Sequence, residues 1–164
     1  MSPRCQWLIL CDRVIVDHVT QQLNLVGCLE NIAAPVFPSV YTGFACAARF
    51  VWPEGGPDRD LSMRFRLVRL EHGAEEREVA VVDGAWAAHT LHARVFVQFQ
   101  QLNLLQPGPL GFRVDFAVDG GEWERGADAW LQIEQAKLTA EQQAQLQSQM
   151  QAMAESASAR GDER

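Results

Sequence analysis

The sequence predicts an all-β fold, an antiparallel immunoglobulin-like β-sandwich of about eight strands in residues 1–136. Apolar and polar residues alternate along most of this region, which is typical of strands with one buried face. Clusters of glycine, proline and aspartate separate the alternating runs, as expected of antiparallel connections. No helical pattern interrupts them before residue 137. Together these features favour a sandwich over a fold with helices between the strands.

The predicted strands follow from this alternation. In the clearest one, Phe112, Val114 and Phe116 share one face, which we expect to be buried. Arg113 and Asp115 fall on the other face, which we expect to be in water, so Asp115→Ala should change stability little. The same procedure gives eight strands, near residues 7–16, 23–32, 42–52, 61–70, 78–82, 91–102, 111–118 and 126–135.

The first strand is apolar on both faces until Asp12 and Arg13 interrupt it. It is either a central strand covered on both sides or a strand with a bulge at these two residues. We expect the bulge, because an unbroken strand would place Asp12 on the same face as Leu8 and Leu10.

A helical tail is predicted at residues 137–158, with a disordered terminus at 159–164. Thr139 and Gln142 form a capping-box sequence, which marks the start of a helix. Leu146, Met150 and Met153 follow at helical spacing and form an apolar stripe. A short helix needs a surface for such a stripe. We expect it to pack near Trp130 of its own sheet, or against a second copy or another protein partner.

Composition narrows the range of partners. The 164 residues carry a net charge of −7, and this charge repels the phosphates of nucleic acid. No stretch of apolar residues is long enough to cross a membrane, and no secretory signal pattern is present. We therefore expect a cytoplasmic protein that binds neither nucleic acid nor membrane. Its four cysteines, which include Cys11, should be free thiols in that compartment.

Several segments resemble an uncharacterised bacterial family of small stand-alone β-sandwich proteins, known only as a domain of unknown function. The resemblance is carried by Cys-Asp-Arg-Val-Ile-Val-Asp at 11–17, by Leu-Asn-Leu-Val-Gly-Cys-Leu-Glu-Asn-Ile at 23–32 and by Ala-Pro-Val-Phe-Pro at 34–38. The segment at 103–116 is similar to the family's closing hairpin. The resemblance covers residues 6–135, and it implies the fold and a cytoplasmic bacterial origin but no activity.

Candidate catalytic and metal-binding residues are few, and we expect no catalytic residue, metal or cofactor. His89 and His92 are close in sequence, but no third ligand is indicated. Carboxylates could meet in the first hairpin, although acidic residues beside turns usually cap backbone amides. The residues concerned are Asp12, Asp17, Glu30 and Asn31.

Two tryptophans are candidate partner contacts, along with the helical stripe. Trp86 lies within a run of small residues, 83–88, that predicts a loop, and Trp130 alternates with inward residues and should face outward. For both, burial by the protein's own elements is the competing interpretation. Arg49, Arg64 and Arg66 are expected on wet faces of neighbouring strands, either as a basic stripe or paired with carboxylates.

The function that these features favour is a non-enzymatic binding or assembly module, forming a homo-oligomer or binding a protein through the helix. One alternative is a sensor for a small molecule or sugar, with Trp86 and Trp123 as stacking surfaces. The other is an enzyme of unrecognised type built around His89, His92 or Cys11.

Overall fold

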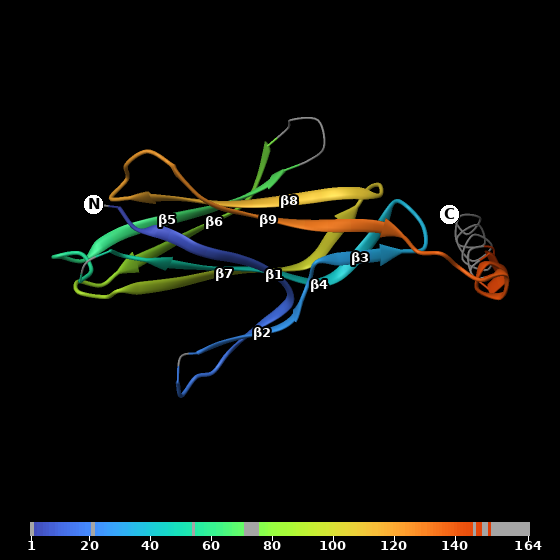
Figure 1. The fold of residues 1–164 in the computed structure, drawn as a ribbon, viewed down its shortest axis with the longest axis horizontal. Coiled ribbons are helices and arrows are strands. Elements are labelled where there is room, and N and C mark those ends of the chain that lie inside the picture. Colours follow the sequence, from blue (N-terminus) through green and yellow to red (C-terminus); the bar gives the residue numbers. More distant parts are fainter. Residues whose placement is uncertain are drawn as a thin grey trace, which may run out of the picture.

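Two β-sheets stack face to face and enclose the core (Figure 1). The structure is a computed structural model that describes residues 2–20, 22–53, 55–70, 76–145, 147–148 and 151. Its strands in chain order are β1 (Arg4–Val16), β2 (Leu23–Cys28), β3 (Asn31–Ala34), β4 (Ser39–Val51), β5 (Leu61–Leu70), β6 (Glu76–Trp86), β7 (His92–Leu104), β8 (Gly108–Val118) and β9 (Glu124–Gln135).

The two sheets differ in size. Sheet A has the order β2-β1-β4-β7, and sheet B has the order β3-β9-β8-β5-β6. All neighbouring strands are antiparallel except β3 and β9, which run parallel, so sheet B is mixed. The all-β prediction is confirmed, but the eight-strand immunoglobulin-like arrangement is not.

The additional strand arises where the predicted strand 23–32 divides. The Leu29 amide still donates to the Leu10 carbonyl of β1 (2.8 Å), whereas the Glu30 carbonyl accepts from Gln132 of β9 (2.9 Å). The chain therefore leaves sheet A and enters sheet B between two consecutive residues. In the sequence, the polar pair Glu30 and Asn31 interrupts the apolar residues at this point, and the single predicted strand passes over it.

The bulge predicted at Asp12 and Arg13 is wrong, because the register shift in β1 lies between Cys5 and Trp7. Asp12 fits into a regular strand since the space beside it belongs to Gly27, whose φ is +64°. A Cβ atom on Gly27 would lie 2.0 Å from Asp12 Oδ2. The Tyr41 hydroxyl donates to the other oxygen of Asp12. A polar partner and a missing side chain therefore replace the expected bulge.

Aromatic rings from both sheets meet in the core. Phe44 of sheet A lies 5.0 Å from Phe112 of sheet B, between ring centroids. Farther along the sandwich, Phe50 lies 4.9 Å from Phe65 and 5.3 Å from Phe116. These rings are bulky, and burial of their surface is the main favourable term in joining the two layers.

The prediction that Arg113 and Asp115 lie in water is wrong, although they do lie on the outer face of sheet B. Arg113 is 9% exposed and Asp115 only 2%. Asp115 accepts from Arg113 Nε and from Arg66 Nε, each at 2.9 Å. Glu76 accepts two further bonds of 2.6 Å from Arg113, and these bonds lower the pKa of Glu76. The Arg66 guanidinium is also 4.7 Å from the centre of the Trp123 ring.

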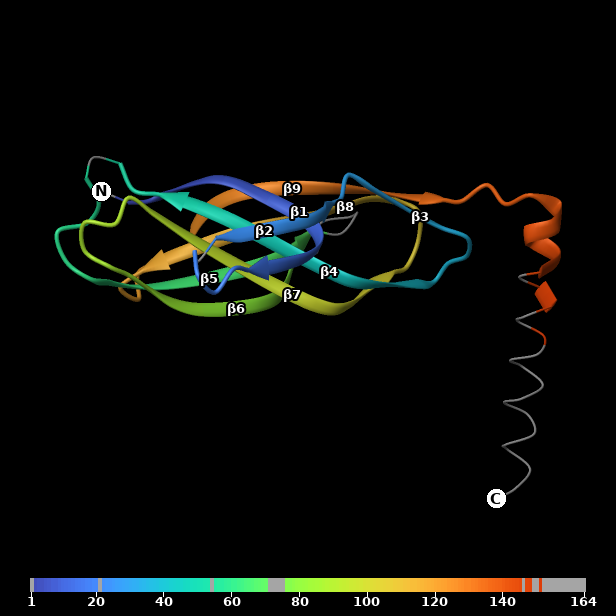
Figure 2. The same ribbon diagram turned by 90° about the horizontal axis from the view of Figure 1, so that it is seen from below.

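The start of the tail helix is confirmed. The Thr139 amide donates to Gln142 Oε1 (2.9 Å), and the Gln142 amide donates to the Thr139 hydroxyl (3.3 Å), which completes the capping box. The described residues of the helix are exposed and lie beyond the end of the sandwich (Figures 1 and 2). Leu146, Met150, Met153 and residues 159–164 lie outside the described residues. No helix in the described part of the chain is long and apolar enough to span a bilayer.

Burial of Asp115 changes the expected result of mutating it. Phe116→Ala removes a buried ring and should lower the free energy of unfolding by about 3–5 kcal/mol. Asp115→Ala should cost a similar amount, about 3–5 kcal/mol, because it removes the buried carboxylate that Arg66 and Arg113 share and leaves Arg113 with Glu76 alone. Asp83→Ala, which removes an exposed partner of Arg64, serves as the control and should have little effect. Urea denaturation of the three variants measures these changes, and an Asp115→Ala protein as stable as the control would contradict the buried network.

Candidate binding surface

His89 and His92 lie in and directly after the loop between β6 and β7. His89 lies in the loop after β6 with a φ of 60°, and its amide donates to the Pro57 carbonyl (2.9 Å). His92 begins β7. Among the described residues, no group of three His, Cys, Asp or Glu side chains could hold a metal ion.

The carboxylates of the first hairpin have structural partners. Asp17 accepts from the amides of Val19 (2.8 Å) and Thr20 (3.0 Å), and these bonds lower the pKa of Asp17. The Asp12 carboxylate accepts from Tyr41, and this bond raises the pKa of Tyr41 to about 12. Both carboxylates therefore hold local structure, as acidic residues beside turns usually do.

The cysteines are all free thiols, and only Cys28 is exposed. Burial raises the pKa of Cys11, and it raises the pKa of Cys5 to about 11. Since the thiolate is the nucleophilic form, these environments suppress the reactivity that a catalytic cysteine needs.

The two candidate tryptophans have different environments. Trp86 is not in a loop but ends β6, where it is 1% exposed and its ring lies 5.6 Å from that of Trp52. Its indole N–H donates to the Thr90 carbonyl (2.7 Å), so the structure supports the core interpretation for Trp86. Trp130 faces outward as predicted and is 57% exposed. Its ring lies over Gly111, where a Cβ atom would come within 2.8 Å of it.

The predicted basic stripe does not exist as one surface. Arg64 and Arg66 lie on β5 of sheet B, where they pair with Asp83 (3.3 Å) and Asp115 (2.9 Å). Arg49 lies on β4 of sheet A, so it is not on a neighbouring strand. The paired interpretation therefore holds for two of the three arginines.

Charge is divided unequally between the sheets. The strands of sheet A carry four arginines, Arg4, Arg13, Arg49 and Arg94, and one carboxylate, Asp12. The described strands of sheet B carry six arginines and seven carboxylates. In a chain of net charge −7, sheet A is thus locally cationic.

Two of these arginines lie side by side. Arg49 of β4 and Arg94 of β7 are directly opposite in the antiparallel register, on the face turned away from the core. Within the described part of the chain, no carboxylate pairs with either, and Arg49 Nε is buried without a hydrogen-bond partner. Like charges directly opposite each other on neighbouring strands destabilise the sheet.

Aromatic residues flank this pair on the same face. Trp7 of β1 lies opposite Arg49, on the side away from Arg94. The next row along the strands contains Phe96, which is 37% exposed, opposite the buried Ala47. We call Trp7, Arg49, Arg94 and Phe96 the cationic patch. The sequence indicated Arg49 alone, because alternation places Arg94 on a wet face without identifying its neighbour.

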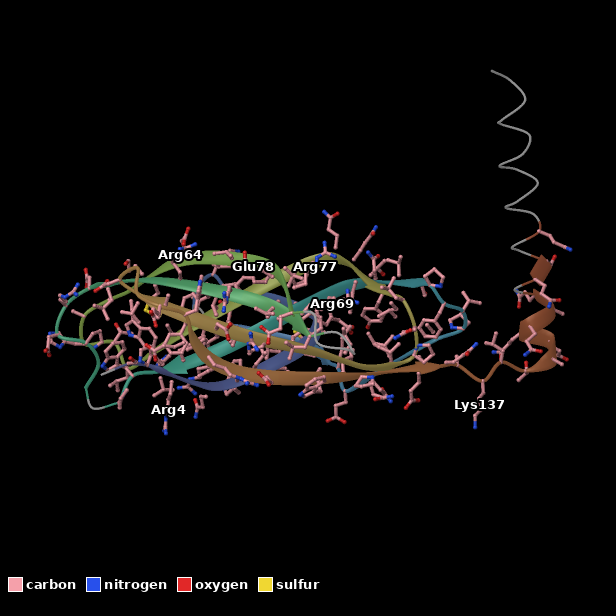
Figure 3. The ribbon with its side chains drawn as sticks, turned by 90° about the horizontal axis from the view of Figure 1, so that it is seen from above. Arg4, Arg64, Arg69, Arg77, Glu78 and Lys137 are labelled. Carbon is pink, nitrogen blue, oxygen red and sulfur yellow. The ribbon has the colours of Figure 1, made fainter. Side chains whose placement is uncertain are left out.

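The patch ends at β7, the edge strand of sheet A (Figure 2). β7 has 13 residues and contains no proline, lysine or carboxylate. The other edges are short or blunted: β2 has six residues, β3 has four and is followed by Pro35, and β6 has a bulge near Val79. Arg77 and Glu78 of β6 also place charged side chains on this edge strand of sheet B (Figure 3). Proteins generally use such features to block strand pairing, and β7 has the fewest.

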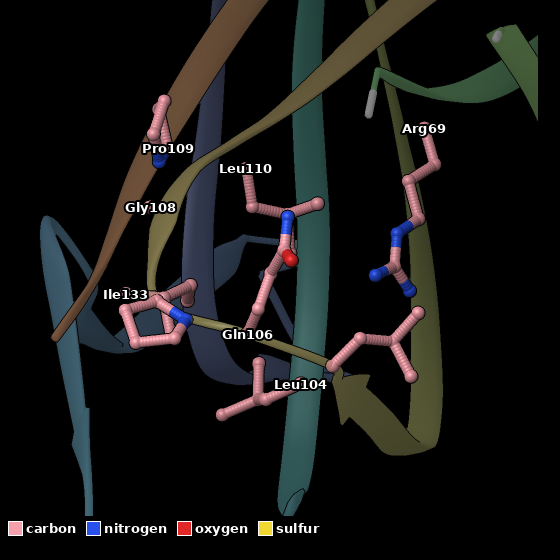
Figure 4. Close-up of a pocket in the computed structure, with 9 residues that line it drawn as sticks. Arg69, Leu104, Gln106, Gly108, Pro109, Leu110 and Ile133 are labelled. Atoms are coloured by element: carbon pink, nitrogen blue, oxygen red, sulfur yellow. The ribbon is translucent and has the colours of Figure 1, made fainter. Parts of the chain in front are cut away.

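A pocket of about 250 Å³ opens at the end of the sandwich near the β7–β8 loop (Figure 4). Its walls are mostly apolar and include Leu104, Leu110 and Ile133. Arg69 reaches its rim but donates to the Asn103 carbonyl (3.1 Å). The pocket therefore contains no converging set of groups suited to acid–base or nucleophilic chemistry.

Comparison with known proteins identifies a family but no function. The sequence model of a family described as "Family of unknown function (DUF6941)" matches residues 6–126, from β1 to the start of β9. This confirms the resemblance to an uncharacterised family. No curated protein matches the chain.

The opposed arginines predict an unusual response to charge reversal. Arg94→Glu turns a repulsive cross-strand pair into an attractive one, so the free energy of unfolding should rise by about 0.5–1 kcal/mol at low salt. Arg64→Glu, the control on sheet B, should lower it, because Arg64 already pairs with Asp83. Urea denaturation of both variants measures the difference. A destabilised Arg94→Glu protein would show that Arg94 has a stabilising partner within the fold.

Proposed function

This chain belongs to the DUF6941 family, and we propose that it is a non-enzymatic binding module whose cationic patch holds an acidic segment of a partner protein. The observation that carries the proposal is the opposed pair of Arg49 and Arg94, which has no carboxylate partner in the described part of the chain. A bound carboxylate would reduce their mutual repulsion and would accept hydrogen bonds from the guanidinium groups.

Guanidinium groups favour carboxylates, because a planar fork of N–H donors matches the two carboxylate oxygens. Two such groups side by side select a partner with at least one acidic residue. The rings of Trp7 and Phe96 flank them and would supply apolar contact, the usual source of affinity at protein interfaces. The combination suits an acidic segment that also carries apolar side chains.

The proposal includes that this protein is not an enzyme. It is supported by the raised pKa values of the buried thiols and by the structural bonds of Asp12 and Asp17. The sensor alternative has less support, since Trp86 is buried and Trp123 lies against Arg66. A cytoplasmic location is also part of the proposal, and the four free cysteines are consistent with it.

A partner contact through the helical stripe is a separate prediction. Its residues, Leu146, Met150 and Met153, lie outside the described residues. The cationic patch is a different surface, and the two contacts are compatible.

A labelled peptide tests the proposal. We expect a fluorescein-labelled peptide of about eight alternating Glu and Val residues to bind the full chain, with binding measured by fluorescence anisotropy. Arg49→Gln and Arg94→Gln should each weaken it about fivefold, because each removes one charge-assisted contact worth about 1 kcal/mol. Raising the salt concentration should weaken it further.

The matched control is Arg64→Gln, which removes the same charge from sheet B and should leave the affinity unchanged. A peptide of alternating Lys and Val should not bind, and an oligothymidine should not bind because of the chain's net negative charge. Equal loss from Arg64→Gln and Arg94→Gln would mean that overall charge, rather than the patch, governs binding.

A further inference from the structure

We infer that the acidic segment binds as an added β-strand on the open edge of β7, with acidic residues turned outward and apolar residues turned inward. This inference rests on the proposed function and goes further, since it specifies the backbone conformation and residue pattern of the partner. Three independent features of β7 lead to it: its backbone edge, its outer row of side chains and its half-buried inner row.

β7 has an open backbone edge. β7 pairs with β4 along its whole length, from His92 to Leu104, and no described strand pairs with its other side. Alternate N–H and C=O groups of an edge strand point away from the sheet and can bond to another extended chain. An added strand of the partner would satisfy these groups, as in other cases of recognition by strand addition.

The outer row sets the charge of the partner. On the outer face of sheet A, Trp7, Arg49 and Arg94 lie in one row across the strands, and an added strand would continue this row beyond Arg94. A Glu or Asp at that position lies next to Arg94, and Arg49 is the following residue of the row.

The inner row favours apolar residues. Val95, Val97 and Phe99 face the core but remain half-buried, because no described strand pairs with the outer edge of β7. Two cavities open between β7 and β6 at these residues. One of about 20 Å³ lies beside Val95 and Val97, and a larger one of about 280 Å³ lies beside Phe99. Inward side chains of the added strand would cover both, with room for the largest one at Phe99.

A second copy of this chain fits less well on the same edge. Pairing β7 with β7 of another copy would bring further arginines to the patch and no carboxylate, since β7 contains none. The bulge near Val79 disfavours β6 in the same role. Charge therefore selects an acidic segment from a different protein.

Methylated peptides test strand addition separately from charge recognition. In an extended peptide of alternating Glu and Val, all Val amides point to one edge and all Glu amides point to the other. We therefore compare the parent peptide with two versions, one N-methylated at every Val and one at every Glu. Side chains and charge are identical in the three.

Pairing with β7 uses one edge of the peptide. One methylated version should lose affinity by about tenfold or more, through lost backbone bonds, while the other binds within about twofold of the parent. Equal affinities of the two methylated versions, whether both strong or both weak, would overturn strand addition. If the parent binds in that case and depends on Arg94, the proposed function survives without it. Failure of the parent to bind would overturn the proposed function and this inference together.

Discussion

A sandwich of two open sheets always has edge strands, and the treatment of these edges decides what this molecule can bind. Unpaired backbone groups at an edge invite another extended chain, so most edges are short, bulged or charged. Here β2 and β3 are short, and β6 combines a bulge near Val79 with the charges of Arg77 and Glu78. β7 spans 13 residues without any of these devices except Arg94. The proposed binding site follows from this difference.

The division of charge between the sheets supports the same conclusion. Sheet B uses its arginines internally, since Arg66 and Arg113 share Asp115 and Arg113 also pairs with Glu76. Breaking such a buried network is costly, which ties these groups to stability. In sheet A, Arg49 and Arg94 face each other without a carboxylate in the described part of the chain. Charges that destabilise the folded state are typical of functional sites.

The features that the sequence predicts correctly are those set by local periodicity. Alternation predicts the buried row of Phe112, Val114 and Phe116, and the capping box at Thr139 forms as expected. Features that depend on which strands become neighbours are not predicted. Asp115 is buried because Arg66 and Arg113 converge on it from two strands, and Arg94 becomes significant only through its position opposite Arg49. The strand at 23–32 divides because its partner changes, and which sheet the chain joins after Glu30 depends on residues far away in the sequence.

The central claim is that β7 presents a free backbone edge to an acidic, extended partner. Residue-resolved amide hydrogen exchange by NMR tests it most directly, with and without the peptide of alternating Glu and Val. In the free protein, alternate amides of β7 should exchange fast, because only every second one bonds to β4. On binding, these fast amides should slow by about tenfold or more, while the amides of β2, β3 and β6 stay unchanged. Slow exchange along all of β7 in the free protein, or protection confined to another edge on binding, would contradict the account.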